Sequence, residues 1–207
     1  ETNVKILIAL KAFSNLALAP LISQYLDGCC SSGLYETRLA AKYFQGEVST
    51  FSPAFKSSEF EEIAGISNHI IFNSLNQFNN FHSVAEKFNK EVGIRVNPLY
   101  SEITNPKYDS ANIYSRLGIH INDLNKIDSD KIDGIHFHTL CEQNFQPLQN
   151  TWDQIKSTII PISKKLKWIN LGGGHHITRK DYELDKLKSF LKKIEDETNC
   201  QIYIEPG

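Results

Sequence analysis

The first side chain in the sequence that suggests chemistry is Lys11. It directly follows an apolar run, residues 4–10, whose pattern is typical of a buried strand. Packing does not explain a lysine at this point, and a lysine whose pKa is lowered by desolvation can form a Schiff base with a carbonyl compound. Pyridoxal phosphate is the common cofactor in such a bond. The alternative is a lysine that buries its stem and carries its charge to the surface.

A run of three glycines, Gly172–Gly174, ends another apolar run and forms the second signal. Backbone N–H groups without side chains beside them can approach a phosphate closely. A plain turn would also explain the run, which lacks the glycine spacing of a dinucleotide-binding fingerprint. Glu205, at the end of the last apolar run, could hold a proton on a pyridine nitrogen. It could equally cap the turn that follows it.

Two histidines, His136 and His138, alternate along one predicted strand, so their side chains face the same side. Such a pair could bind a metal ion, but a metal site needs further ligands, and His175 and His176 are candidates. The alternative is that one histidine stacks or is buried and the other is structural. The pattern leaves both interpretations open.

The elements that must position these residues are recurring apolar runs with helical patterns between them. Almost continuous apolar runs predict parallel strands that are buried on both faces. The predicted strands are residues 4–10, 28–32, 47–51, 69–73, 92–97, 134–139, 166–171 and 202–205. Eight such units predict a (β/α)8 barrel, with a doubly wound open sheet as the alternative. In a barrel, the carboxyl ends of the strands carry the active site.

Two segments between the strands have distinct patterns. Residues 15–26 predict a helix, which ends near Asp27 and Gly28. Residues 99–112 form a long polar stretch rich in Asn, Ser, Tyr and Pro. A loop of this length within a compact domain is usually functional or mobile.

The composition excludes several classes of function. The chain has 207 residues and a formal net charge of -2, so its composition does not indicate nucleic-acid binding, which usually needs a basic surface. No apolar run is long enough to predict a membrane span. The four cysteines form no C-x-x-C motif and predict reduced thiols in a cytoplasmic protein. The sequence contains no Met, and we expect a piece of a longer protein, cut at both ends.

Several segments resemble the fold-type III pyridoxal-phosphate enzymes, which include alanine racemase, ornithine decarboxylase and diaminopimelate decarboxylase. The resemblance lies in residues 8–12, 115–118, 137–138, 170–174 and 204–207 and in Arg95. It implies a TIM-like barrel of the alanine racemase type, incomplete at both ends, with pyridoxal 5'-phosphate as cofactor. It implies that Lys11 forms the covalent bond to the cofactor, that His138 stacks on the pyridine ring and that Arg95 lies near the ring. It implies that Glu205 contacts the pyridine nitrogen. The residues it assigns to phosphate binding are Gly172, Gly173, Gly174 and Gly207. Lys11 and His138 are the catalytic residues in this resemblance.

Within that family, the carboxynorspermidine/carboxyspermidine decarboxylases are the nearer resemblance. The segments that carry it are residues 30–36, 52–56, 72–75, 114–119, 136–142 and 172–178, in that order along the chain. The string Gly-Gly-Gly-His-His-Ile-Thr at 172–178 is specific to this branch. The resemblance implies decarboxylation of a polyamine precursor to norspermidine or spermidine, in a homodimer with shared active sites. The resemblance also implies that residues 1–207 form one barrel domain that binds pyridoxal phosphate, and that these residues do not include the C-terminal β-domain of the parent enzyme.

The sequence departs from the wider family at two points. Ornithine decarboxylase has an acid on the second strand, where this chain has Cys29 and Cys30, and a serine where Cys141 stands. Three alternatives therefore remain: another basic amino-acid decarboxylase of the diaminopimelate or ornithine type, a non-catalytic barrel that binds pyridoxal phosphate, and a metal-dependent hydrolase that uses the two histidines of the sixth predicted strand.

Overall fold

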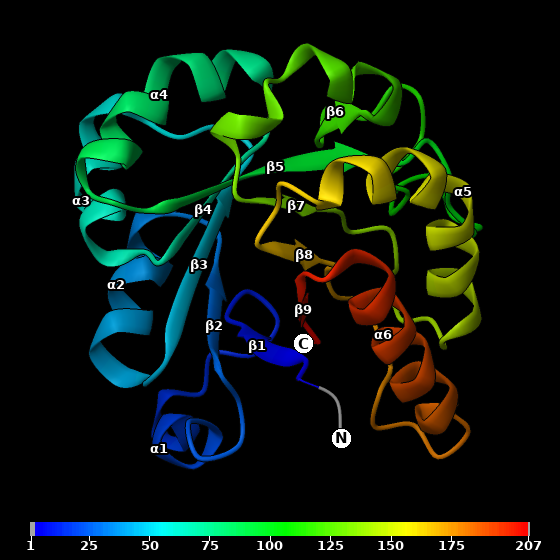
Figure 1. The fold of residues 1–207 in the computed structure, drawn as a ribbon. Coiled ribbons are helices and arrows are strands. Elements are labelled where there is room, and N and C mark those ends of the chain that lie inside the picture. Colours follow the sequence, from blue (N-terminus) through cyan, green and yellow to red (C-terminus); the bar gives the residue numbers. More distant parts are fainter. Residues whose placement is uncertain (1–2, 207) are drawn as a thin grey trace.

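The structure is a computed structural model that describes residues 3–206. A closed barrel of eight parallel strands forms its centre (Figure 1). Its strands are β1 (Lys5–Ala9), β2 (Gly28–Ser31), β3 (Glu47–Ser52), β4 (His69–Phe72), β5 (Glu91–Asn97), β7 (Gly134–His136), β8 (Trp168–Asn170) and β9 (Gln201–Ile204). They pair in this order, and β9 pairs with β1 to close the cylinder. A short strand, β6 (Ile119–His120), pairs in parallel with the carboxyl end of β5. The predicted barrel is therefore confirmed, and the open sheet is excluded.

Helices cover the outside of the barrel (Figure 1). They are α1 (Ala19–Ile22), α2 (Leu34–Tyr43), α3 (Ser57–Ile66), α4 (Leu75–Lys87), α5 (Gln146–Ser163) and α6 (Leu184–Thr198), with 3-10 turns at Leu16–Leu18, Ile121–Lys126 and Ser129–Lys131. The long helix predicted over residues 15–26 is wrong, because only one 3-10 turn and the four residues of α1 form there. Asn15 caps the first turn, and the chain then folds back so that Asp27 can join the start of β2.

Side chains that point inward fill the barrel, because residues two apart along a strand face the same side. Leu7, Ile71, Trp168 and Tyr203 pack together in the middle layer. Trp168 fits because Gly134 lies against its indole, where an added Cβ would overlap the ring. The interior is therefore a packed core, and ligands can reach only its ends.

The larger core lies between the sheet and the helices. Outward-facing strand residues such as Ile70, Ile94 and Ile135 are fully buried there, against Phe60 of α3 and other helical side chains. Burial on both faces explains why the strands read as continuous apolar runs. Among residues 3–206, no helix is long and apolar enough to cross a membrane.

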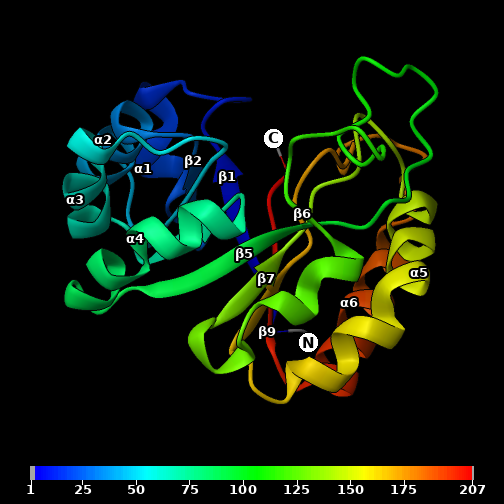
Figure 2. The same ribbon diagram turned by 90° about the horizontal axis from the view of Figure 1, so that it is seen from above.

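The long polar stretch after β5 is a loop that is tied to the strand ends (Figure 2). The Asn73 side chain accepts from the Gly118 N–H at 2.8 Å and donates to the Arg116 carbonyl at 2.8 Å. The Ser110 hydroxyl donates to the His138 carbonyl at 2.7 Å. These bonds fix the loop beside the carboxyl ends of the strands, where the predicted site residues lie.

Candidate active site

The carboxyl ends of the strands form a polar layer directly above the packed interior. The side chains of this layer that line one small cavity are Cys30, Phe51, Arg95, His136 and Glu205, together with Lys11, Ser31, Ser32 and His138 from the segments around them. The structure therefore brings Lys11, Arg95, His138 and Glu205 together, as predicted. Gly207 lies outside the described residues.

Lys11 lies in the turn that directly follows β1. The N–H groups of Ala12 and Phe13 both donate to the Ala9 carbonyl at 3.0 Å, which turns the chain away from the barrel axis. The lysine side chain is exposed, and among residues 3–206 it forms no ion pair. It lines the same cavity as Glu205, which follows β9, the strand paired with β1. An exposed amine at the edge of this cavity is accessible to a ligand that enters from the carboxyl end.

Glu205 directly follows β9 and is nearly buried, with a side chain that is 12% exposed. Its Oε1 accepts from the Asn170 side chain at 2.7 Å, and its Oε2 lies 3.7 Å from Nε2 of His136. Burial alone would raise the pKa of this carboxyl group, but His136, the Asn170 bond and His138 outweigh it and lower the pKa to about 2. Glu205 is therefore an anion that lines the cavity, with one oxygen held by an amide and the other near the His136 ring.

His138 has a fixed ring orientation. The Gly173 N–H donates to its Nδ1 at 2.9 Å, so a neutral ring must carry its proton on Nε2. Burial first, and then the positive charges of Arg95 and Lys11, lower the pKa of His138 to about 3. The ring is therefore neutral at physiological pH, and one nitrogen is already engaged.

These histidines do not support the metal interpretation. Nδ1 of His138 is occupied by a backbone N–H, and within residues 3–206 no group of three His, Cys, Asp or Glu side chains could hold a metal ion. The two histidines lie instead beside a carboxylate and an arginine. A metal site needs at least three converging ligands, so the hydrolase alternative has no support in this part of the chain.

Arg95 supplies a buried positive charge on β5. Its guanidinium lies 4.6 Å from the centroid of the Phe51 ring, and its Nη2 donates to the His138 carbonyl at 3.4 Å. Burial lowers its pKa to about 10, which leaves it charged at neutral pH. The Glu205 carboxylate opposes that shift. Arg95 and Glu205 thus give the cavity one fixed cation and one fixed anion.

The triple glycine mainly allows close packing of the backbone around Glu205. An added Cβ on Gly173 would overlap the Glu205 carbonyl, and Gly172 and Gly174 adopt positive φ angles of 73° and 83°. The Gly172 N–H donates to Asn170 Oδ1 at 2.9 Å, and the Gly173 N–H donates to His138. Only the Gly174 N–H has no partner among residues 3–206. Two of the three N–H groups are thus engaged within the chain, and phosphate binding by the glycines stays a prediction.

Two residues that hold the site together were not recognised as such from the sequence. Asn170 bonds both Glu205 and the Gly172 N–H, and Phe51 lies under the Arg95 guanidinium. Period-two alternation could have found them, because both stand on inward positions at the carboxyl end of their strands. The missing information was the register between β3, β5, β8 and β9, which sets which side chains meet.

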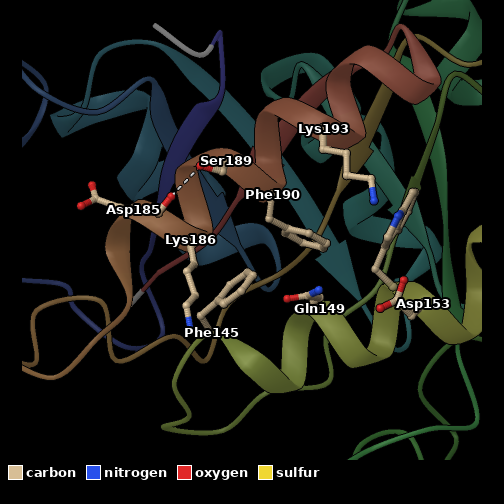
Figure 3. Close-up of a pocket in the computed structure, with 9 residues that line it drawn as sticks. Phe145, Gln149, Asp153, Asp185, Lys186, Ser189, Phe190 and Lys193 are labelled. Atoms are coloured by element: carbon tan, nitrogen blue, oxygen red, sulfur yellow. Dashed lines mark hydrogen bonds between the residues drawn. The ribbon is translucent and has the colours of Figure 1, made fainter.

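A larger hollow of about 440 Å³ lies on the outside of the barrel, between α5 and α6 (Figure 3). The rings of Phe145 and Phe190 meet there at 5.3 Å between centroids. Its charged residues pair with residues three or four positions away along the chain, such as Lys193 with Glu197. None of the predicted site residues lines it, so the small cavity at the strand ends is the candidate active site.

Comparison with known proteins first defines the class. No family model matches the chain. The barrel superposes on diaminopimelate decarboxylase from Helicobacter pylori with a TM-score of 0.79 and 20% identity, covering 99% of this chain and 57% of that chain, a likeness that shows the fold. The protein therefore has a TIM-like barrel of the alanine racemase type.

Proteins with higher sequence identity to this chain belong to one type of decarboxylase. The chain is 40% identical over 207 residues to carboxynorspermidine/carboxyspermidine decarboxylase of Campylobacter jejuni and 35% identical over 210 residues to that of Herminiimonas arsenicoxydans. The crystal structure of carboxynorspermidine decarboxylase from Campylobacter jejuni, complexed with norspermidine, superposes with a TM-score of 0.89 at 40% identity and covers 99% of this chain and 52% of that chain. The chain spans about half the length of these curated relatives, 54% and 56%. The resemblance stated from the motifs is confirmed.

Proposed function

We propose that residues 1–207 form the pyridoxal-phosphate-binding barrel of a decarboxylase that converts carboxynorspermidine or carboxyspermidine to norspermidine or spermidine. One observation carries this proposal: an exposed lysine, a buried carboxylate and a fixed neutral histidine meet at one small cavity. The 40% identity to relatives of that name supports the choice of substrate.

The donor set fits the cofactor. Lys11 offers an amine without an ion pair among residues 3–206, and Glu205 offers an anionic carboxylate that lines the same cavity. When bound, pyridoxal phosphate supplies a conjugated pyridine ring that accepts the electron pair left by departing CO2. The Gly174 N–H has no partner within the described part of the chain, and it would meet the phosphate.

The residues of this chain would divide the work of the reaction. Lys11 would bind the cofactor and release it to the incoming substrate amine. Glu205, which is ionised, would hold a proton on the pyridine nitrogen and so keep the ring electron-poor. His138, whose ring orientation is set by the Gly173 N–H, would cover one face and exclude water. The α-carbon loses CO2 and takes up one proton in its place.

A cationic substrate is supported by acids in the loops that follow β5 and β7. Glu102 and Glu142 line a hollow of about 500 Å³ in the loops after β5 and β7. The Glu102 carboxylate is held by Tyr100 at 2.7 Å and by Asn150 at 2.6 Å. Two carboxylates that line one hollow suit a substrate whose amines are protonated at neutral pH. The acids lie on tethered loops, so their spacing could select the length of the polyamine.

We further propose that the active protein is a cytoplasmic homodimer that completes its sites across an interface and carries a β-domain outside these residues. Large side chains are exposed after two strands: Tyr114 and Ile113 in the loop after β5 are 91% and 62% exposed, and Tyr35 in the first turn of α2 is 72% exposed. Exposed aromatic and apolar side chains of this size suit a partner surface. Sedimentation of the full-length protein tests this: a monomer at micromolar concentration would contradict it.

The decisive assay offers the full-length protein carboxynorspermidine, carboxyspermidine, diaminopimelate and ornithine, and measures CO2 release. We expect turnover of the first two, and at least a 1000-fold loss in Lys11→Ala, on the order expected for loss of a covalent catalyst. Borohydride reduction should fix the cofactor on the peptide that contains Lys11. Lys5→Ala, at the other end of the same strand, is the control and should stay active.

Two results would overturn the proposal. Preferential turnover of diaminopimelate or ornithine would identify another decarboxylase of this fold. Cofactor fixed on Lys11 without turnover of any of the four compounds would identify a barrel that binds pyridoxal phosphate without catalysing decarboxylation.

A further inference from the structure

His136 on β7 is a buried histidine that the proposed mechanism does not use. Its side chain is 3% exposed, and neither ring nitrogen has a hydrogen-bond partner among residues 3–206. Buried polar atoms without partners are costly and are rare in native structures, where they often mark a functional site. The ring is held in place by packing, with its centroid 5.7 Å from that of Phe51.

Every charged or titratable group that faces His136 comes from a different element of the site. Lys11 follows β1, Cys30 is on β2, Arg95 is on β5, His138 follows β7 and Glu205 follows β9. Burial first, and also Arg95 and Lys11, lower the pKa of His136, while Glu205 opposes that shift. A neutral ring has one N–H to donate, and Glu205 is the anion that faces it.

The carboxylate of Glu205 is held on one side only. Its Oε1 accepts from Asn170 at 2.7 Å, whereas its Oε2 lies 3.7 Å from Nε2 of His136, slightly beyond hydrogen-bond distance. A small rotation of the carboxylate about its Asn170 bond would close that gap. Hydrogen bonds at active sites are often long in the free protein and shorten when a ligand binds.

We propose that His136 is a positioning residue that acts through Glu205. Its Nε2–H donates to Oε2 and, together with Asn170 on Oε1, fixes the plane of the carboxylate and keeps it ionised. The consequence for a bound pyridine ring rests on the proposed function, but the effect on Glu205 belongs to the barrel itself. Without His136, burial would favour the protonated acid, which could no longer retain a proton on the ring nitrogen.

Two amide variants separate donor position from side-chain volume. His136→Gln places an amide N–H near the position of Nε2, whereas the shorter amide of His136→Asn ends near the position of Nδ1 and cannot reach Oε2. In the cofactor-free full-length protein, infrared difference spectra against Glu205→Gln give the pH midpoint of Glu205 ionisation. We expect the midpoint to rise by about one pH unit or more in His136→Asn and to return most of the way in His136→Gln.

The unaltered protein provides a measurement that does not depend on how the variants fold. Nitrogen NMR of the His136 ring should show a proton on Nε2 and a bare Nδ1. In protein loaded with pyridoxal phosphate, His136→Asn should shift the pH dependence of the visible absorption in the same direction as the Glu205 midpoint. It should also lower kcat about tenfold and leave KM for the substrate within about twofold, because His136 does not touch the substrate. His69→Asn, a buried histidine at the opposite end of the barrel, is the control and should leave all these values unchanged.

The outcomes distinguish this inference from the proposed function. An unchanged Glu205 midpoint in His136→Asn, or a proton on Nδ1 of His136 in the unaltered protein, would overturn the inference even if the protein decarboxylates its substrate. A raised midpoint together with failure to bind pyridoxal phosphate would uphold the inference and overturn the proposed function.

Discussion

Charged side chains line both ends of the barrel, but the two ends differ in how completely these side chains are paired. At the amino end, Lys5 pairs with Glu47, whose second oxygen accepts from the Tyr203 hydroxyl at 2.7 Å. On the opposite wall, Glu91 lies between His69 at 3.4 Å and Lys167 at 3.1 Å. These charged groups have partners close to them.

At the carboxyl end, the charged and polar side chains are less completely paired. Among residues 3–206, Lys11 forms no ion pair and the His136 ring forms no hydrogen bond. One carboxylate oxygen of Glu205 has no donor within hydrogen-bond distance among these residues. Both ends come from the same strands and the same alternation of side chains, so the fold alone does not require the difference. Paired charges indicate a structural role, whereas incomplete pairing around a cavity indicates a site that is completed by a ligand.

The largest expected effect is on the carboxyl end. Glu205→Gln removes the negative charge but preserves the side-chain shape, so we expect kcat to fall by about 10²- to 10³-fold with little change in stability, on the scale of losing one preorganised electrostatic group. Steady-state kinetics and urea unfolding of the full-length protein measure the two effects. Glu91→Gln is the matched change at the amino end and should leave kcat unchanged. Equal loss of activity in both variants would remove the distinction between the ends.

Gly173→Ala tests the close packing beneath Glu205. An added Cβ would overlap the Glu205 carbonyl, so the backbone must shift, and we expect a loss of about 1–3 kcal/mol in the free energy of unfolding. Because the same shift moves the Glu205 carboxylate and the donor to His138, activity should also fall. Chemical denaturation measures the first effect and kinetics the second. Full stability in this variant would show that the segment is looser than its packing indicates.

Glu91 gives the amino end a pH dependence. The hydrogen bond from His69, and then Lys167, lower its pKa from 4.5 to about 2 against the opposing effect of burial. A carboxyl group with a depressed pKa adds stability above its ordinary pKa and loses it as the pH falls toward the folded-state value. We therefore expect Glu91→Gln to cost about 1 kcal/mol at pH 7, since the group is partly exposed and screened, and the difference to shrink between about pH 4.5 and 2. Urea unfolding at several pH values measures it, and a difference that grows on acidification would contradict it.

The smallest effect is expected at Lys5. Its amine contacts Glu47 and lies 5.5 Å from the centroid of the Tyr203 ring. For a partly exposed pair of this kind we expect Lys5→Ala to cost about 0.5–1 kcal/mol in stability and to leave kcat within about twofold. Thermal unfolding and the decarboxylation assay test both parts. A large loss of activity would mean that the two ends are coupled through the packed middle layer.

The strands were predictable because burial on both faces makes each an apolar run, and their number then predicts the barrel. Lys11 and Glu205 were predictable because each is a charged residue placed directly after such a run. The roles of Asn170 and His136 were not, because they depend on register: β8 and β9 pair so that Asn170 stands beside Tyr203, two residues before Glu205. The helix expected over residues 15–26 failed because local pattern does not reveal where the chain must fold back.

The two tryptophans lie on opposite sides of the sheet, Trp168 within the strand cylinder and Trp152 on α5 outside it. Because they lie in two different packed layers, their emission should report on two different parts of the protein. A chromophore seated on Lys11 should quench the two indoles to different extents. Intrinsic fluorescence could therefore time the arrival of a ligand at the carboxyl end separately from unfolding of the outer layer.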